Sequence, residues 1–320
     1  MGYLKSVGVL LTVIIFLIAC EENPSMVEED SISTMECDVA NNRYSDVVFS
    51  SIDSIVDVQY GIAPTGEALL LDVYVPKEDL TICKRPLVIF IHGGGFHEGD
   101  RKMFAAKAIV EDLPFKGYVT ASISYRLAAE EPYTLEDLQE EKLDFENPHL
   151  DPIHITNAMH DARAAVRHFK KNAELYNIDP HRIAIGGASA GGMTAINVGY
   201  MNKETELFAG ALPDNVKGAS GNQEFSSDVK VVFSLCSGFL NLEMMDDANE
   251  PALFLQQNAL DTIFIGNRLN QLRMRIDEIG LKHEILEQGG VHCLWGIPIA
   301  GLIDLIQLRK ELTDFLAVNL

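Results

Sequence analysis

Residues 183–193 read Ile-Ala-Ile-Gly-Gly-Ala-Ser-Ala-Gly-Gly-Met, and this stretch decides the fold. An apolar strand runs into a turn at 187–191, and a helical pattern follows at once. A serine on so sharp a strand-to-helix turn needs small residues two positions before and after it, because a side chain there would collide with a neighbouring strand or helix. Gly187 and Gly191 meet that need around Ser189. The stretch therefore predicts a nucleophilic serine at a strand end, with the start of a helix behind it to favour developing negative charge.

Apolar runs and helical periods alternate on both sides of this turn. Runs without polar alternation suit strands that are buried on both faces, and they fall at 86–91, 118–122, 182–185, 229–233, 252–255 and 283–286. Helical periods lie between or after them, at 102–112, 155–176, 193–202, 262–279 and 302–318. Two earlier strands, 55–60 and 68–75, flank a turn at 64–66 and predict an antiparallel start to the sheet. The pattern predicts one α/β domain over 46–320, with a mostly parallel central sheet and helices on both faces.

A glycine-rich loop follows the strand at 86–91. Residues 91–96 read Ile-His-Gly-Gly-Gly-Phe. Three glycines let backbone N–H groups approach a substrate oxygen without obstruction by side chains, as stabilisation of a tetrahedral oxyanion requires. We expect Gly94, Gly95 and Ala190 to donate these hydrogen bonds, and Phe96 to contact the substrate. The alternative is a phosphate-binding turn, but no Lys followed by Ser or Thr opens a helix after it, as a nucleotide-binding loop would need.

With these two motifs the chain resembles the carboxylesterases that carry an H-G-G-G sequence, including the hormone-sensitive-lipase-like branch of the α/β-hydrolases. Two further stretches are similar to that family: Ser-Ile-Ser-Tyr-Arg-Leu at 122–127 and His-Asp-Ala-Arg-Ala-Ala-Val at 160–166. The resemblance covers roughly residues 55–315. It implies an α/β-hydrolase fold, and a catalytic triad in the chain order serine, acid, histidine.

The acid and the base are expected in loops at the carboxyl ends of later strands, where chemistry takes place in an open α/β sheet. Asp261 follows the strand at 252–255, whereas its rivals Asp246 and Asp247 precede that strand. The family more often has His-Gly before this aspartate and Val-Pro after it, where this chain has Gln-Asn and Ile-Phe. We predict Asp261 as the acid.

His292 is the predicted base. It lies in a glycine-rich loop after the strand at 283–286, whereas His283 opens that strand and belongs at its other end. His292 would take the proton of Ser189 and pass it to the leaving group, while Asp261 would orient the imidazole. The resemblance thus implies a serine carboxylesterase that forms an acyl-enzyme and needs neither metal nor cofactor. A serine exopeptidase and a non-catalytic surface binding module of the same fold are the alternatives.

The charge of the chain limits its partners. With 47 acidic against 25 basic residues, the formal net charge is -22, so nothing here could neutralise a row of phosphates. Nucleic acid is therefore excluded as the expected partner, and a small-molecule or glycan ester is the expected substrate.

The N-terminus has the pattern of an export signal. Lys5 precedes an apolar run at 7–19 that has the length of a signal-peptide core and ends in Leu-Ile-Ala-Cys at 17–20. These last residues resemble a bacterial lipobox, which predicts a signal peptide at 1–19, lipidation of Cys20 and a flexible tether at 20–45. The expected location is that of an exported bacterial lipoprotein, periplasmic or anchored at the outer membrane or cell surface. An ordinary signal peptide that ends at a cysteine is the alternative.

Four cysteines follow Cys20: Cys37, Cys83, Cys236 and Cys293. Four cysteines allow three complete pairings, and disulfides persist in an exported protein. We favour Cys37 with Cys83, because both flank the first strands. A thiol nucleophile at Cys293 is also considered, although no partner base stands at a recognisable spacing.

An acidic insertion at about 128–151 falls outside the alternation of strands and helices. It contains nine acidic residues and one basic residue, Lys142. It could form a lid over the strand ends or a solvated excursion on the surface, and the sequence favours neither.

Overall fold

A computed structural model describes residues 42–81, 83–128, 152–207, 216–238, 241–261, 267–297 and 300–320. Within them, eight strands form one sheet in the order β1-β2-β4-β3-β5-β6-β7-β8. The strands are β1 (Ile52–Ile62), β2 (Ala68–Pro76), β3 (Arg85–Ile91), β4 (Val119–Ile123), β5 (Ile178–Ala188), β6 (Val231–Leu235), β7 (Ala252–Asn258) and β8 (His283–Gln288). β2 pairs antiparallel with both β1 and β4, and every other pair is parallel. The predicted mostly parallel sheet with an antiparallel start is confirmed.

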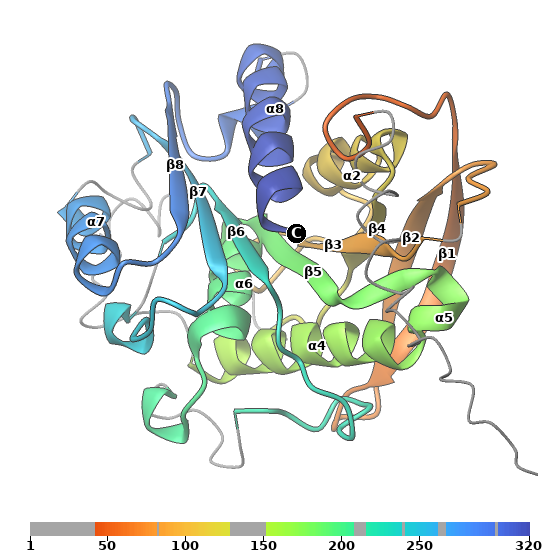
Figure 1. The fold of residues 1–320 in the computed structure, drawn as a ribbon. Helices are drawn as coiled ribbons and strands as arrows, with labels where there is room; N and C mark the ends of the chain where they lie inside the picture. The colour runs from red at the N-terminus through yellow and green to blue at the C-terminus, as the bar shows by residue number, and fades with distance from the viewer. Residues whose placement is uncertain are drawn as a thin grey trace, which may run out of the picture.

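Helices cover both faces of the sheet (Figure 1). Buried residues of α4 (Pro152–Lys171), α6 (Ala190–Tyr200) and α7 (Asn267–Ile279) share one core with Leu87, Ile89 and Ile91 of β3. Buried residues of α2 (Phe104–Val110) and α8 (Leu302–Asn319) share the other core with Val88 and Phe90 of the same strand. Successive side chains of a strand point to opposite faces, so an uninterrupted apolar run fills both cores.

Short helical turns occupy several connections. They are η1 (Leu113–Lys116), α5 (Ala173–Tyr176), η2 (Glu204–Glu206), η3 (Leu242–Met244) and η4 (Leu294–Gly296). The last of these turns follows the loop that carries His292.

The prediction of one continuous helix at 155–176 is wrong, because the helix is broken at Asn172. The side-chain amide of Asn172 donates to the carbonyl of His168 at 2.8 Å, and such side-chain bonds compete with a continuing helix. α5 then ends at Tyr176, because the next residue, Asn177, has a φ of 49°, in the left-handed region that stops helices. The chain enters the sheet directly afterwards, so β5 begins at Ile178 rather than at Arg182.

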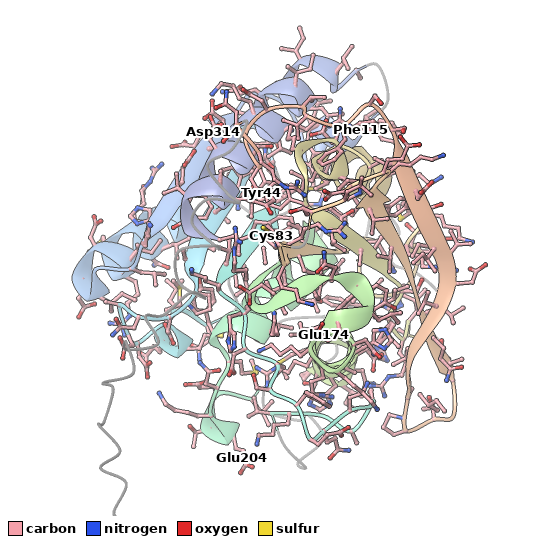
Figure 2. All side chains as sticks on the ribbon, turned by 45° about the vertical axis from the view of Figure 1, so that its right-hand side comes forward. Tyr44, Cys83, Phe115, Glu174, Glu204 and Asp314 are labelled. Atoms are coloured by element: carbon pink, nitrogen blue, oxygen red, sulfur yellow. A yellow bond between two sulfur atoms is a disulfide. The ribbon has the colours of Figure 1, made fainter. Side chains whose placement is uncertain are left out.

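The packed domain begins by Tyr44, inside the segment 20–45 predicted as a tether. Tyr44 is 4% exposed, its N–H donates to the carbonyl of Lys116 at 2.8 Å, and its ring meets that of Tyr118 edge-on (Figure 2). The predicted signal peptide and most of the tether lie outside the described residues, as does the acidic insertion beyond Ala128. Among the described helices, none combines the length and the apolar character needed to cross a membrane.

Candidate active site

Ser189 occupies the turn between β5 and α6. Its backbone has φ 52° and ψ −121°, a conformation that residues other than glycine seldom adopt. The N–H of Ser189 donates to the carbonyl of Leu235 on β6 at 2.9 Å, and the carbonyl of Ser189 accepts from the N–H of Met193 at 3.0 Å. The neighbouring strand and the new helix therefore hold the strained turn from both sides.

The glycines on either side of Ser189 leave no room for a side chain. A β-carbon on Gly187 would lie 2.3 Å from the carbonyl oxygen of Ile91, and one on Gly191 would lie 2.1 Å from the same oxygen. Both distances are far below van der Waals contact. The sharp turn can therefore form only because both positions are glycine.

His292, Asp261 and Ser189 form a chain of hydrogen bonds. Nε2 of His292 lies 2.9 Å from Oγ of Ser189, and Nδ1 lies 2.8 Å from Oδ2 of Asp261. The Asp261 side chain is 1% exposed and the His292 side chain is 20% exposed. A carboxylate can only accept, so Nδ1 carries the proton and Nε2 is left to accept from the serine hydroxyl. This is the tautomer that a general base needs.

The rival residues lie elsewhere. Asp246 and Asp247 precede β7, and the carboxylate of Asp247 accepts from Asn249 beside it. His283 is the first residue of β8, at the opposite end of that strand from His292. The structure thus brings together the three residues that the sequence selected and leaves these rivals apart from them.

The glycine-rich loop lies against Ser189. A β-carbon on Gly93 would stand 3.2 Å from Cβ of Ser189. Gly94 and Gly95 have φ values of 117° and 59°, and no hydrogen bond among the described residues uses the N–H of either one as donor. Ala190 is the first residue of α6, where N–H groups have no partner within the helix. That these three N–H groups bind the oxyanion stays a prediction.

Phe96 closes the glycine-rich loop with a left-handed backbone, φ 68°. Its side chain is 2% exposed and its ring packs edge-on against Tyr125 at 6.3 Å between centroids. In this position Phe96 supports the loop from the core. Contact between Phe96 and a substrate stays a prediction.

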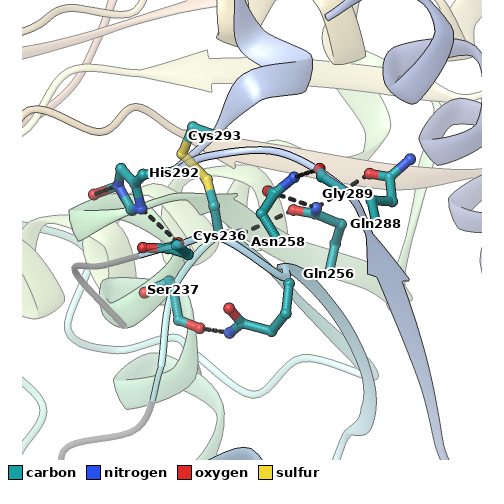
Figure 3. Close-up of a disulfide and its surroundings, with 11 residues drawn as sticks. Cys236, Ser237, Gln256, Asn258, Gln288, Gly289, His292 and Cys293 are labelled. Carbon is teal, nitrogen blue, oxygen red and sulfur yellow. Dashed lines mark hydrogen bonds and ion pairs between the residues drawn. A yellow bond between two sulfur atoms is a disulfide. The ribbon is translucent and has the colours of Figure 1, made fainter. Parts of the chain in front are cut away.

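A disulfide joins Cys236 and Cys293, with Cα atoms 5.2 Å apart (Figure 3). Both thiols are consumed, so the thiol nucleophile considered at Cys293 is not available. The same bond removes two ligands from the group of Cys236, His292 and Cys293, whose ligand atoms lie within 4.8 Å of one another. Cys83 is also disulfide-bonded, and its predicted partner Cys37 lies outside the described residues.

Sequence reasoning missed a buried network of amides beside the disulfide (Figure 3). Nε2 of Gln256 donates to Asn258 at 2.9 Å and to Gln288 at 3.1 Å, and Nδ2 of Asn258 donates to the carbonyl of Gly289 at 2.7 Å. The backbone N–H of Cys236 donates to both the backbone and the side-chain oxygen of Gln256. The network ties together the ends of β6, β7 and β8. Its signal in the sequence is an amide cluster, 256–258, at the end of an apolar strand.

The fold is that of an α/β-hydrolase. It has an eight-stranded sheet of this topology, a serine on a strand-to-helix turn, and an aspartate and a histidine after later strands. The family model described as BD-FAE matches residues 71–141 and 150–278, more than half of the chain. The chain therefore belongs to the BD-FAE family.

Among curated proteins, the chain is 31% identical to Esterase LipC of Mycobacterium tuberculosis over 135 residues, which is 42% of this chain and 27% of that protein. It is 27% identical to Esterase cest-33 of Caenorhabditis elegans over 155 residues, 47% of this chain and 26% of the relative. The chain spans about a quarter of the length of these relatives.

Solved structures share the fold. The apo form of Thermogutta terrifontis esterase 2 matches with a TM-score of 0.62 at 15% identity, over 85% of this chain and 95% of that one. A truncated form of a carbohydrate esterase from gut microbiota matches with a TM-score of 0.62 at 22% identity, over 85% of this chain and 96% of that one.

His92, which opens the glycine-rich loop, makes the stability of the fold depend on pH. Its side chain is buried and stacks on Tyr125, and its Nδ1 lies 2.7 Å from the carbonyl oxygen of Gly93. Burial lowers the pKa of His92 to about 4, although the bond to Gly93 opposes this shift. The folded state thus favours the neutral ring, whereas the unfolded chain takes up a proton near pH 6.5. The stability from His92 is complete above that pH, and it is lost as the pH falls toward 4.

We expect His92→Gln to flatten this dependence. Between pH 7 and pH 4 its free energy of unfolding should fall by about 3 kcal/mol less than that of the wild type, since one pKa unit corresponds to about 1.4 kcal/mol. Urea unfolding of both proteins at pH 7, 5.5 and 4 measures the difference. The contributions of the other titrating groups to the pH dependence are the same in both proteins and cancel in the comparison. Parallel curves for the two proteins would contradict the assignment to His92.

Proposed function

We propose that this α/β-hydrolase is a serine carboxylesterase that hydrolyses its substrate through an acyl-enzyme. The observation that carries the proposal is the continuous hydrogen-bonded chain from Ser189 through His292 to Asp261, at 2.9 and 2.8 Å, with the serine on a strained strand-to-helix turn. The esterase names of the relatives and structural neighbours support the same reaction class.

In the acylation step, Oγ of Ser189 attacks the ester carbonyl while Nε2 of His292 takes the hydroxyl proton. The negative charge moves to the carbonyl oxygen, which the N–H groups of Gly94, Gly95 and Ala190 would stabilise. When the intermediate collapses, the ester C–O bond breaks and His292 passes the proton to the departing alcohol. Asp261 keeps the imidazole in the required tautomer and offsets its positive charge.

In the second half of the reaction a water molecule replaces the alcohol. His292 takes a proton from this water, and the hydroxide attacks the acyl carbon. Collapse of the second intermediate returns the proton to Oγ of Ser189 and releases a carboxylic acid. All these steps use residues of the chain and water.

For the substrate, we propose acyl or acetyl esters carried on carbohydrate outside the cytoplasm. Two features support this class. The sequence at 1–20 has the pattern of a lipoprotein signal with Cys20 as the lipidated residue, which would anchor the enzyme to a membrane of a bacterium and keep it outside the cytoplasm. A neighbour of the same fold is described as a carbohydrate esterase from gut microbiota.

Covalent labelling with a fluorophosphonate probe tests the nucleophile. We expect the folded wild type to be labelled once, at Ser189, because the probe needs a serine activated by a neighbouring base. Ser189→Ala should abolish labelling and lower kcat on p-nitrophenyl acetate by at least about 10⁴-fold. Absence of labelling in folded wild type would favour a non-catalytic binding module. Equal labelling of Ser189→Ala would refute the assigned nucleophile.

The role of Asp261 is tested against that of an aspartate near the same strand. Asp261→Asn should lower kcat by about 10³- to 10⁴-fold, because the amide stabilises the wrong imidazole tautomer, while KM changes little. Asp247→Asn, before β7, makes the same chemical change away from the histidine and should keep wild-type kcat. If the two variants have similar kcat values, Asp261 is not the acid.

A substrate series tests the proposed class. We expect kcat/KM to be highest for p-nitrophenyl acetate, to fall as the acyl chain lengthens, and acetate to be released from acetylated xylan. Preference for acyl chains of eight or more carbons would contradict the carbohydrate assignment. Hydrolysis of aminoacyl p-nitroanilides in place of esters would favour an exopeptidase.

A further inference from the structure

We propose that the Cys236–Cys293 disulfide is a positioning crosslink for the base of the catalytic triad. The proposal rests on the esterase function above, and it assigns to two residues outside the triad a part in the same reaction. The crosslink would hold the loop of His292 at the distance from Ser189 that proton transfer requires.

The two cysteines lie next to residues that the site depends on. Cys293 directly follows His292 in the chain. Cys236 directly follows Leu235, whose carbonyl accepts the hydrogen bond from the N–H of Ser189. The disulfide, which closes a sequence separation of 57 residues, therefore connects the neighbour of the base to the strand end that holds the nucleophile. The close-up shows His292, Cys293 and Cys236 side by side (Figure 3).

The anchoring side of the crosslink is rigid. Cys236 is fully buried, and its N–H donates to the backbone carbonyl of Gln256 at 2.8 Å and to the side-chain oxygen of the same residue at 3.1 Å. Gln256 belongs to the buried amide network with Asn258 and Gln288. Cys236 is thus fixed to β7 and β8 as well as to its own strand.

The segment directly before the base is rich in glycine. The residues before His292 are Gly289, Gly290 and Val291, and Val291 is 50% exposed. The backbone carbonyls of Gly289 and Gly290 accept hydrogen bonds from Asn258 and Leu260, so the start of the loop is held. The bond at Cys293 holds the loop directly after the histidine.

Backbone conformation at both cysteines points to the same role. Cys236 has φ 45° and Cys293 has φ 48°, both in the left-handed region that is uncommon for residues with a side chain. Such conformations persist when the surroundings fix them, and they gather at functional sites. A crosslink between two such positions fixes both turns at once. Without it we expect the His292 loop to relax away from Ser189.

The test compares two double variants, each designed to remove one disulfide. Cys236→Ala/Cys293→Ala should lower kcat on p-nitrophenyl acetate by about 10- to 100-fold, because small displacements of a catalytic group cost that much. KM should stay within about twofold, and fluorophosphonate labelling should slow in proportion to kcat. Cys37→Ala/Cys83→Ala is the control. Cys83 precedes β3, at the opposite end of the parallel strands from the site, so wild-type kcat is expected even where Tm falls.

Reduction of the wild type gives a second measurement that needs no variant to fold. The reductant concentration is raised until alkylation and mass spectrometry show that half of the chains carry Cys236 and Cys293 as thiols. EDTA is present, because these thiols and His292 would offer three metal ligands within 4.8 Å of one another. We expect kcat to fall with the fraction of reduced chains, and to return on reoxidation.

The outcomes separate the two proposals. If the wild type is neither labelled at Ser189 nor active on esters, the proposed function fails, and the positioning role fails with it. If the wild type is active, and the double variant or the half-reduced protein keeps wild-type kcat, only the positioning role is overturned. A fall in Tm with unchanged kcat and labelling rate also overturns it, because that is the signature of a crosslink that stabilises the fold alone.

Discussion

The hydrogen bond from the N–H of Ser189 to the carbonyl of Leu235 is the contact on which the arrangement of the site depends. It holds a serine at φ 52° against the end of the next strand, with Oγ of that serine 2.9 Å from Nε2 of His292. The turn can reach that strand only because Gly187 and Gly191 lie against the carbonyl of Ile91 without a side chain between them. Exposure of the nucleophile is thus a consequence of close backbone packing between β5, β3 and β6.

Parallel pairing then brings distant residues together. β3, β5, β6, β7 and β8 are neighbours in the sheet and run in one direction, so their carboxyl ends meet at one edge. The glycine-rich loop follows β3, and Ser189 follows β5. Cys236, Asp261 and His292 lie after β6, β7 and β8. Adjacent strands are about 4.8 Å apart, so side chains of successive loops can reach one another directly. The triad and the disulfide are two results of the same topology.

Local patterns account for what could be predicted from the sequence. The apolar runs predicted the sheet, and the turn glycines predicted the position of Ser189, because both follow from contacts that each strand must make. Asp261 and His292 could be selected by their places after later strands, together with the triad order that the family resemblance implies. The break at Asn172 depends on a side-chain bond to His168 that competes with the helix, and periodicity does not record it. The Cys236–Cys293 pairing depends on which loops meet at the sheet edge, which no local pattern contains.

Four residues at this edge of the molecule have an unfavourable backbone conformation. Phe96, Ser189, Cys236 and Cys293 all have left-handed backbone conformations, and each follows a strand of the parallel part of the sheet. Each costs roughly 1–3 kcal/mol, so they persist only where surrounding packing fixes them. The two cores supply that packing, because the strands that lead to these turns are buried on both faces. The long apolar strands therefore have a second role besides forming the sheet: they hold four unfavourable turns in the positions that the site requires.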